Sequence, residues 1–281
     1  MRQPAIAVPC TAWRRQGASA GERTIPEETA VAFTYDGGSY AVMMATPQDL
    51  EDFAFGFGFT EGVISSPADI RQLDVVQHDA GIELRMWLNE PRAAALSERR
   101  RYLAGPTGCG LCGIDSLDEA VRPPAQVRGS ATFTPAEIMR ALDALPPRQE
   151  LNRQTRAVHA AAFWRRGSGL FAVREDVGRH NALDKLAGAL AREGVAGASG
   201  MVLLTSRVSV EMVQKTAVIG ASLLVAVSAP TALALRTAEA AGITLIGVAR
   251  GDGFEIFTHA RRIANEPATA TVATATVAHV A

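Results

Sequence analysis

Cysteine is scarce in this chain, and its scarcity excludes one class of protein. Three cysteines among 281 residues are too few, and odd in number, to form a disulfide framework. A small secreted scaffold is therefore excluded, and we expect a reducing compartment. The sequence also lacks the order of regions found in a signal peptide, because the short apolar stretch at 5–8 is followed by Pro9, Cys10 and charged residues. We expect a cytoplasmic protein.

The chain also lacks an excess of charge of either sign. Lys plus Arg is 28 and Asp plus Glu is 29, so the formal net charge is -1. No global field attracts nucleic acid or an anionic membrane, and we expect neither as a partner. The apolar run at 217–235 is long enough for a membrane span, but glycine, serine and proline interrupt it. We interpret it as the buried core of an α/β domain.

Turn signals in the first hundred residues predict a small α+β unit. Alternating apolar runs around glycines predict two hairpins, one over 30–44 and one over 73–88. Between them, Thr46 and Pro47 are typical of a helix start, with Thr46 as the cap and Gly62 as the end of the helix.

The second half of the chain alternates strand and helix patterns. A helix over 134–145 and a hairpin over 157–174 precede a helix over 181–192. Three short apolar strands then alternate with two helices, in the order 201–205, 209–221, 223–228, 230–241 and 243–248. This order predicts parallel strands joined by right-handed crossovers.

Together these patterns divide the chain into five segments. The segments are an N-terminal extension at 1–25, a small α+β domain at 26–103, a glycine-rich loop and connector at 104–130, an α/β domain at 131–266 that should bind a ligand, and a low-complexity tail at 267–281.

The parallel strands predict where a ligand would lie. Ligands of open α/β sheets bind beyond the carboxyl ends of the strands. Here those ends carry Arg207 and the glycine-containing segment 248–253. Glycine allows close backbone approach, and Arg207 and Arg250 can pair with phosphate oxygens. A nucleotide site and ordinary strand-to-helix turns explain this pattern equally well.

A second polar segment, 175–181, precedes the helix predicted over 181–192. It packs two acids, two bases and an amide around one glycine, and such a helix start can hold an anion on its backbone N–H groups. Capping and salt bridging by Asp176 and Arg179 explain the same residues without a ligand. His180 is either a ligand or acid–base group or a structural, hydrogen-bonded histidine.

Cys109 and Cys112 form the sharpest local signal, because glycines surround both thiols. A zinc site would need two further ligands, and no second cysteine pair exists. A thioredoxin-like dithiol would need a helix start at the motif, whereas the capping box begins only at Ser116. A sulfur carrier needs a thiolate that accepts sulfane sulfur as a persulfide, and a glycine-rich loop suits it. Two buried structural cysteines are the remaining alternative.

Four separated motifs resemble the FdhD/NarQ family of sulfur-carrier proteins required for formate dehydrogenase activity. The motifs lie at 107–113, 158–161, 174–185 and 206–215, and the resemblance spans roughly residues 30–262. The resemblance implies a homodimer with a cytidine-deaminase-like α/β domain, whose sheet is parallel or mixed, and a smaller N-terminal α+β domain.

The resemblance also implies a reaction. A cysteine desulfurase would load sulfur onto Cys109 as a persulfide, with Cys112 assisting. The sulfur would pass to the bis-molybdopterin guanine dinucleotide form of the molybdenum cofactor before this cofactor enters formate dehydrogenase. We expect GDP to mimic the nucleotide, Arg207 and His180 to contribute to cofactor binding, and His180 and Arg179 to shape the pocket without holding a metal. The residues implied in guanine dinucleotide binding are Val248, Ala249, Arg250, Gly251, Asp252 and Gly253.

Two other functions fit the same residues. A cofactor-binding chaperone would deliver the cofactor without transferring sulfur and should tolerate the loss of both thiols. A dithiol oxidoreductase would cycle a disulfide between Cys109 and Cys112 and would need no cofactor.

Overall fold

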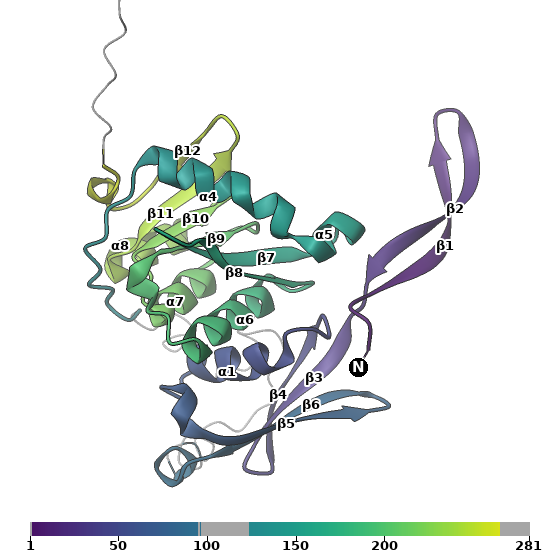
Figure 1. The fold of residues 1–281 in the computed structure, drawn as a ribbon, viewed down its shortest axis with the longest axis horizontal. Helices are drawn as coiled ribbons and strands as arrows, with labels where there is room; N and C mark the ends of the chain where they lie inside the picture. The colour runs from purple at the N-terminus through teal and green to yellow at the C-terminus, as the bar shows by residue number, and fades with distance from the viewer. Residues whose placement is uncertain (1, 95, 97–123, 265–281) are drawn as a thin grey trace, which may run out of the picture.

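The computed structural model describes residues 2–94, 96 and 124–264 of the chain. Three sheets organise them: a two-stranded ribbon, a four-stranded sheet and a six-stranded sheet (Figure 1). Cys109 and Cys112 lie outside the described residues, as do most of the connector predicted at 104–130 and the whole tail at 267–281.

The N-terminal extension forms a long antiparallel ribbon. β1 (Ala5–Arg14) pairs with β2 (Gly17–Pro26) along its whole length. The ribbon projects away from the other two sheets (Figure 1). Alanine is frequent in both strands and glycine in β2, and because these residues favour β-structure weakly, the sequence did not predict this ribbon.

The four-stranded sheet contains both hairpins predicted in the first hundred residues, which confirms them. Its strands are β3 (Thr29–Tyr35), β4 (Gly38–Ala45), β5 (Ile70–His78) and β6 (Gly81–Leu88), in the order β4-β3-β6-β5. Helix α1 (Leu50–Thr60) covers one face and buries its apolar side there. The rings of Phe33 and Phe57 stack with centroids 4.0 Å apart in this core.

The six-stranded sheet has the order β12-β11-β10-β9-β7-β8. Its strands are β7 (His159–Arg165), β8 (Gly169–Asp176), β9 (Met201–Leu204), β10 (Leu223–Ala226), β11 (Thr244–Arg250) and β12 (Gly253–Ile256). β9, β10 and β11 are parallel, as predicted, whereas β7, β8 and β12 pair antiparallel. The sheet is therefore mixed.

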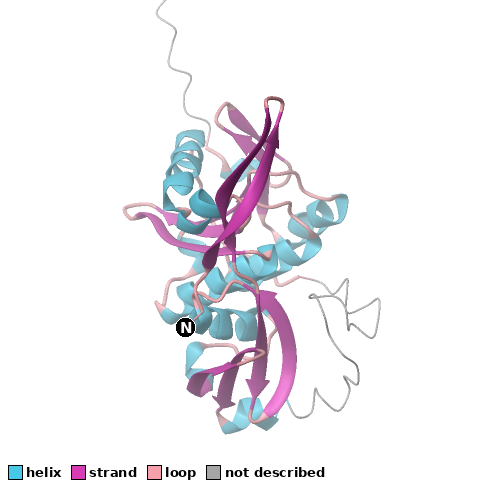
Figure 2. Cartoon of the chain, turned by 90° about the vertical axis from the view of Figure 1, so that its right-hand side faces the viewer, coloured by secondary structure: helices cyan, strands magenta, loops and turns pink. Residues whose placement is uncertain are grey.

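Helices cover both faces of this sheet, and two apolar cores result. The helices are α4 (Pro135–Arg148), α5 (Glu150–Thr155), α6 (Arg179–Arg192), α7 (Val210–Ile219) and α8 (Ala232–Ala241). α6, α7 and α8 share one core with alternate strand residues, and α4 packs on the other face with the remaining ones. Three short helical turns, at 67–69, 197–199 and 260–262, complete the fold. Figure 2 shows helices lying between the two larger sheets.

Helices α1 and α6 cross at very close range. A Cβ atom on Gly56 would lie 1.7 Å from the backbone oxygen of Asp184, and one on Gly188 would lie 1.9 Å from that of Asp52. Only glycine fits at either position, because any side chain would overlap backbone atoms of the facing helix. This crossing fixes α6, and with it the start of α6, against the four-stranded unit.

Two sequence-based expectations were wrong in detail. Thr46 does not cap a helix, because α1 begins only at Leu50. Its backbone N–H instead donates to Asp176 (3.0 Å), and its hydroxyl accepts from the backbone N–H of Val177 (3.1 Å). Thr46 therefore satisfies buried polar groups 130 residues away, which outweighs local capping.

The segment 248–253 is not a strand-to-helix turn. Residues 248–250 complete β11, and Gly253 begins β12, so the segment forms the end of a β-hairpin. Among the residues with described placement, no helix is long and apolar enough to cross a membrane.

Candidate functional site

The carboxyl ends of four strands lie together at one end of the six-stranded sheet. The candidate site lies along this row of strand ends, which we call the sheet edge. β9, β10 and β11 run parallel. β7 is antiparallel to both β9 and β8, so β8 runs in the same direction as β9. The edge therefore carries Arg179 and His180 after β8, Arg207 after β9 and Arg250 at the end of β11. The structure brings the two polar segments found in the sequence to one side of the sheet.

Backbone hydrogen bonds join neighbouring loops of this edge. Val208 accepts from the N–H of Thr231 (2.9 Å) and donates to Ala229 (3.3 Å), which connects the loops after β9 and β10. The N–H of Val248 donates to Ser228 (3.2 Å), which connects the loop after β10 to β11. Because these bonds are made between backbone atoms, they fix the loops while their side chains stay available.

The predicted binding segment combines strain with exposure. Val248 has φ 52°, in the left-handed region that a β-branched residue rarely adopts. Ala249 is buried, whereas Arg250, Gly251 and Asp252 are exposed at the turn. Arg207 is also exposed. Arg207 and Arg250 are exposed to solvent, which screens their charges, so each would contribute only modestly to the free energy of binding an anion.

His180 and Glu211 meet where two helices begin. His180 is the second residue of α6 and Glu211 the second residue of α7, and His180 Nε2 lies 4.0 Å from Glu211 Oε2. Their side chains are 22% and 15% exposed. Within the described part of the chain, these two atoms and Arg179 Nε are buried and have no hydrogen-bond partner.

The electrostatics of this cluster keep His180 neutral and Glu211 ionised near pH 7. Burial lowers the pKa of His180 to about 4, and the positive charges of Arg179 and Lys215 act in the same direction. Burial raises the pKa of Glu211, but the Ser209 hydroxyl, the backbone N–H of Glu211 and the positive charge of Arg179 lower it by more, so the net pKa falls below its usual value. Burial also lowers the pKa of His159, the first residue of β7.

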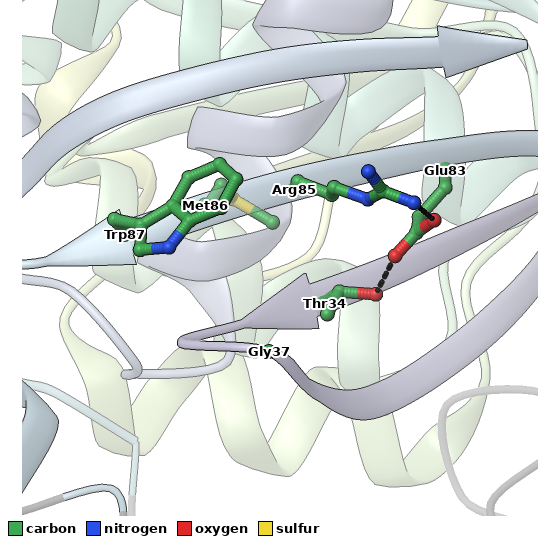
Figure 3. Close-up of a pocket in the computed structure, with 6 residues that line it drawn as sticks. All are labelled: Thr34, Gly37, Glu83, Arg85, Met86 and Trp87. Carbon is green, nitrogen blue, oxygen red and sulfur yellow. Dashed lines mark hydrogen bonds and ion pairs between the residues drawn. The ribbon is translucent and has the colours of Figure 1, made fainter.

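One pocket lies away from this edge, on the four-stranded sheet (Figure 3). It encloses about 320 Å³ and is lined by residues of β3, β6 and the β3–β4 turn. Glu83 within it already accepts hydrogen bonds from Arg85 (2.8 Å) and Thr34 (2.9 Å). Because this carboxylate is satisfied by its neighbours, the pocket has less to offer a polar ligand than the sheet edge.

The sequence did not predict a role for Glu211. The residue lies in a motif that supported the family resemblance, but its meaning depends on the approach of His180 from 31 residues earlier in the chain. A carboxylate in the first turn of a helix that follows a strand end was the only local signal, and it equally fits a favourable interaction with the helix dipole.

Comparison with known proteins identifies the family of this chain. The sequence model of the FdhD/NarQ family matches residues 26–264. This chain belongs to the FdhD/NarQ family. The match begins where β2 ends, so nearly all of the N-terminal ribbon lies outside the region that matches the family model.

Two relatives of this FdhD/NarQ chain match it over most of both chains. It is 53% identical over 254 residues to the sulfur carrier protein FdhD of Agrobacterium fabrum, which covers 90% of this chain and 94% of the relative. It is 49% identical over 254 residues to that of Cupriavidus necator, which covers 90% and 88%.

A solved structure confirms the fold. The crystal structure of a protein from Desulfotalea psychrophila, provisionally described as a formate dehydrogenase accessory protein, matches with a TM-score of 0.74 at 24% identity. The match covers 93% of this chain and all of that one, 100%. The mixed α/β fold is therefore shared, and its likeness to cytidine deaminases stays a prediction.

Proposed function

We propose that this chain is a sulfur carrier that serves formate dehydrogenase. The observation that carries the proposal is 53% identity, over 90% of this chain, to a protein named as a sulfur carrier. The pair Cys109 and Cys112 supplies the thiols that the reaction needs. The proposal also includes a cytoplasmic location and a homodimer.

The first step of the proposed reaction loads the carrier. The Cys109 thiolate attacks the outer sulfur of a persulfide on a cysteine desulfurase, and the thiolate of the desulfurase leaves. Cys109 then holds the sulfur as its own persulfide. Cys112 assists, either by holding the sulfur in turn or by displacing it from Cys109.

The second step delivers the sulfur to a substrate, the bis-molybdopterin guanine dinucleotide form of the molybdenum cofactor. The sheet edge offers groups that suit such a substrate. Arg207 and Arg250 can meet its phosphates, and the turn 251–253 leaves the backbone accessible. His180 and Glu211 are the polar groups available to its ring systems. These features support the cofactor as the acceptor.

Complementation tests the proposal. Cells that lack the native protein receive the Cys109→Ala, Cys112→Ala or double variant at matched expression, and formate dehydrogenase activity is measured. Cys109→Ala should abolish activity because alanine cannot form a persulfide, while Cys112→Ala should reduce it. Cys10→Ala is the matched control, since Cys10 lies on the projecting ribbon and should be dispensable.

Two outcomes would contradict the proposal in different ways. Full activity of Cys109→Ala would overturn its role as the carrier. Full activity of the double variant would indicate a chaperone that binds the cofactor without transferring sulfur. A disulfide between Cys109 and Cys112 that cycles without any cofactor would indicate an oxidoreductase instead.

A further inference from the structure

Two buried atoms at the sheet edge have hydrogen-bonding capacity that the described residues do not use. Glu211 Oε2 is an ionised acceptor, His180 Nε2 is 4.0 Å away, and that separation is too long for a hydrogen bond between them. A buried carboxylate oxygen without a donor destabilises the fold. Buried polar groups in folded proteins nearly always have a partner, so these two atoms are the candidates for contact with a bound molecule.

The charges around the pair define what that ligand must present. Arg179 lies on the same helix as His180, and its Nε has no acceptor among the described residues. Lys215 lies on α7, but it is engaged by Asp184 (2.8 Å) and by Glu61, the residue that follows α1 (3.0 Å). A ligand that fits this site must therefore present N–H donors to Glu211 and a hydrogen-bond acceptor to Arg179.

A phosphate does not fit this description, because an ionised carboxylate would repel it. A ring N–H flanked by a carbonyl on one side and an amino group on the other does fit. The two donors can bond to one carboxylate, and the carbonyl oxygen can accept from a guanidinium. The 2-amino-4-oxopyrimidine ring has this pattern, and both guanine and pterin contain it.

We propose that Glu211, with His180 and Arg179 beside it, binds the 2-amino-4-oxopyrimidine edge shared by guanine and pterin. Glu211 is then a specificity-determining residue, because a ligand without the amino group leaves its carboxylate unsatisfied. The inference rests on the proposed function, since the proposed cofactor substrate contains both ring systems.

Calorimetric binding of two ligand pairs tests the proposal on the full chain. GDP is compared with IDP, and pterin with lumazine, because in each pair only the first ligand has the 2-amino group. The wild-type protein should favour the amino-bearing ligand by about tenfold or more in at least one pair. Glu211→Gln, which keeps the side-chain shape, should remove that preference, because GDP or pterin should lose more affinity than IDP or lumazine.

The arms of the experiment distinguish the two sources of the ring. Loss of the GDP preference alone assigns the site to guanine, and loss of the pterin preference alone assigns it to pterin. Glu193→Gln is the matched control, because Glu193 is exposed at the opposite end of α6 and should keep every preference. The wild-type comparisons need no variant, so a folding defect in Glu211→Gln does not leave the proposal untested.

Three results would overturn the inference. They are a wild-type protein with no preference in either pair, a protein that binds none of the four ligands, and a Glu211→Gln variant that keeps the wild-type preference. Persulfide loading of Cys109 by a desulfurase is measured on the same Glu211→Gln sample. It should be unchanged, so a failure of the ring-binding role is separable from a failure of the sulfur-carrier role.

Discussion

Among the described residues, buried polar side chains have partners on the inner face of α6 and lack them at the start of the helix. On the inner face, Lys185 bonds to Asp176 (2.6 Å) with both side chains fully buried, and Asp184 bonds to Lys215 and to Thr60. At the start, His180 and Arg179 each carry a buried nitrogen that no described residue satisfies. The paired groups therefore maintain the fold, whereas the unpaired ones are available to a ligand.

Removing one member of a paired group should have the largest effect on stability. Lys185→Met leaves Asp176 as a buried charge without its cation and should lower the free energy of unfolding by about 3–5 kcal/mol. The double variant Asp176→Asn, Lys185→Met should lose less, because no charge remains. Urea unfolding measures both. If the double variant is the less stable of the two, the ion pair is not what maintains this face.

Crowding the helix crossing should have the next largest effect. Gly188→Ala forces a Cβ atom into the backbone of α1 and should lower the free energy of unfolding by about 3 kcal/mol. Gly21→Ala on the ribbon is the control, because no atom lies within 4 Å of its added Cβ. Thermal unfolding compares the two. Equal stability would show that α1 and α6 can separate without loss.

The unpaired start of α6 should appear in the pH dependence of stability. The pKa of His180 is 6.5 in an unfolded chain and about 4 in the fold, so the unfolded state binds more protons between these values. The stability that His180 contributes is present above pH 6.5 and is lost as the pH falls toward 4.

We expect His180→Gln to flatten this dependence by about 2 kcal/mol, a magnitude reduced because the side chain is 22% exposed. His159 shifts in the same direction, so part of the dependence should survive. Urea unfolding at pH 7, 5.5 and 4 measures it. An unchanged pH profile in His180→Gln would place this histidine in solvent.

The smallest effect should come from the exposed cation at the hairpin. Arg250→Ala removes a charge that can pair with a phosphate, and because the side chain stands in water, GDP binding should weaken by only about 0.5–1 kcal/mol. Calorimetry at low ionic strength measures the change. Unchanged GDP affinity would remove Arg250 from the binding site.

Local patterns were enough to predict most of the fold. Hairpins appeared where glycines separate alternating strands, and the parallel strands β9, β10 and β11 followed from regular alternation with helices. β12 was missed because, unlike the equally short β9 and β10, it is not buried and has no continuous apolar run. Thr46 was assigned wrongly because its partner, Asp176, is distant in the sequence.

The candidate site was predictable only in part, for the same physical reason. The parallel topology alone predicts that Arg207 and Arg250, which follow or end two of the strands, lie at the same end of the sheet. The approach of His180 to Glu211 depends on how α6 is held by the crossing at Gly56 and Gly188, and this is a contact between distant segments. Sequence patterns report local periodicity, so they contain no direct information on such an approach.

Mass spectrometry tests the sulfur-carrier proposal most directly. The full chain is incubated with a cysteine desulfurase and cysteine, thiols are blocked, and the peptide that contains Cys109 and Cys112 is analysed. The account predicts the added mass of one sulfur atom on Cys109 in the wild-type protein and none on Cys10. A wild-type protein that never acquires sulfur on either thiol of this peptide, while the desulfurase is active, would contradict it.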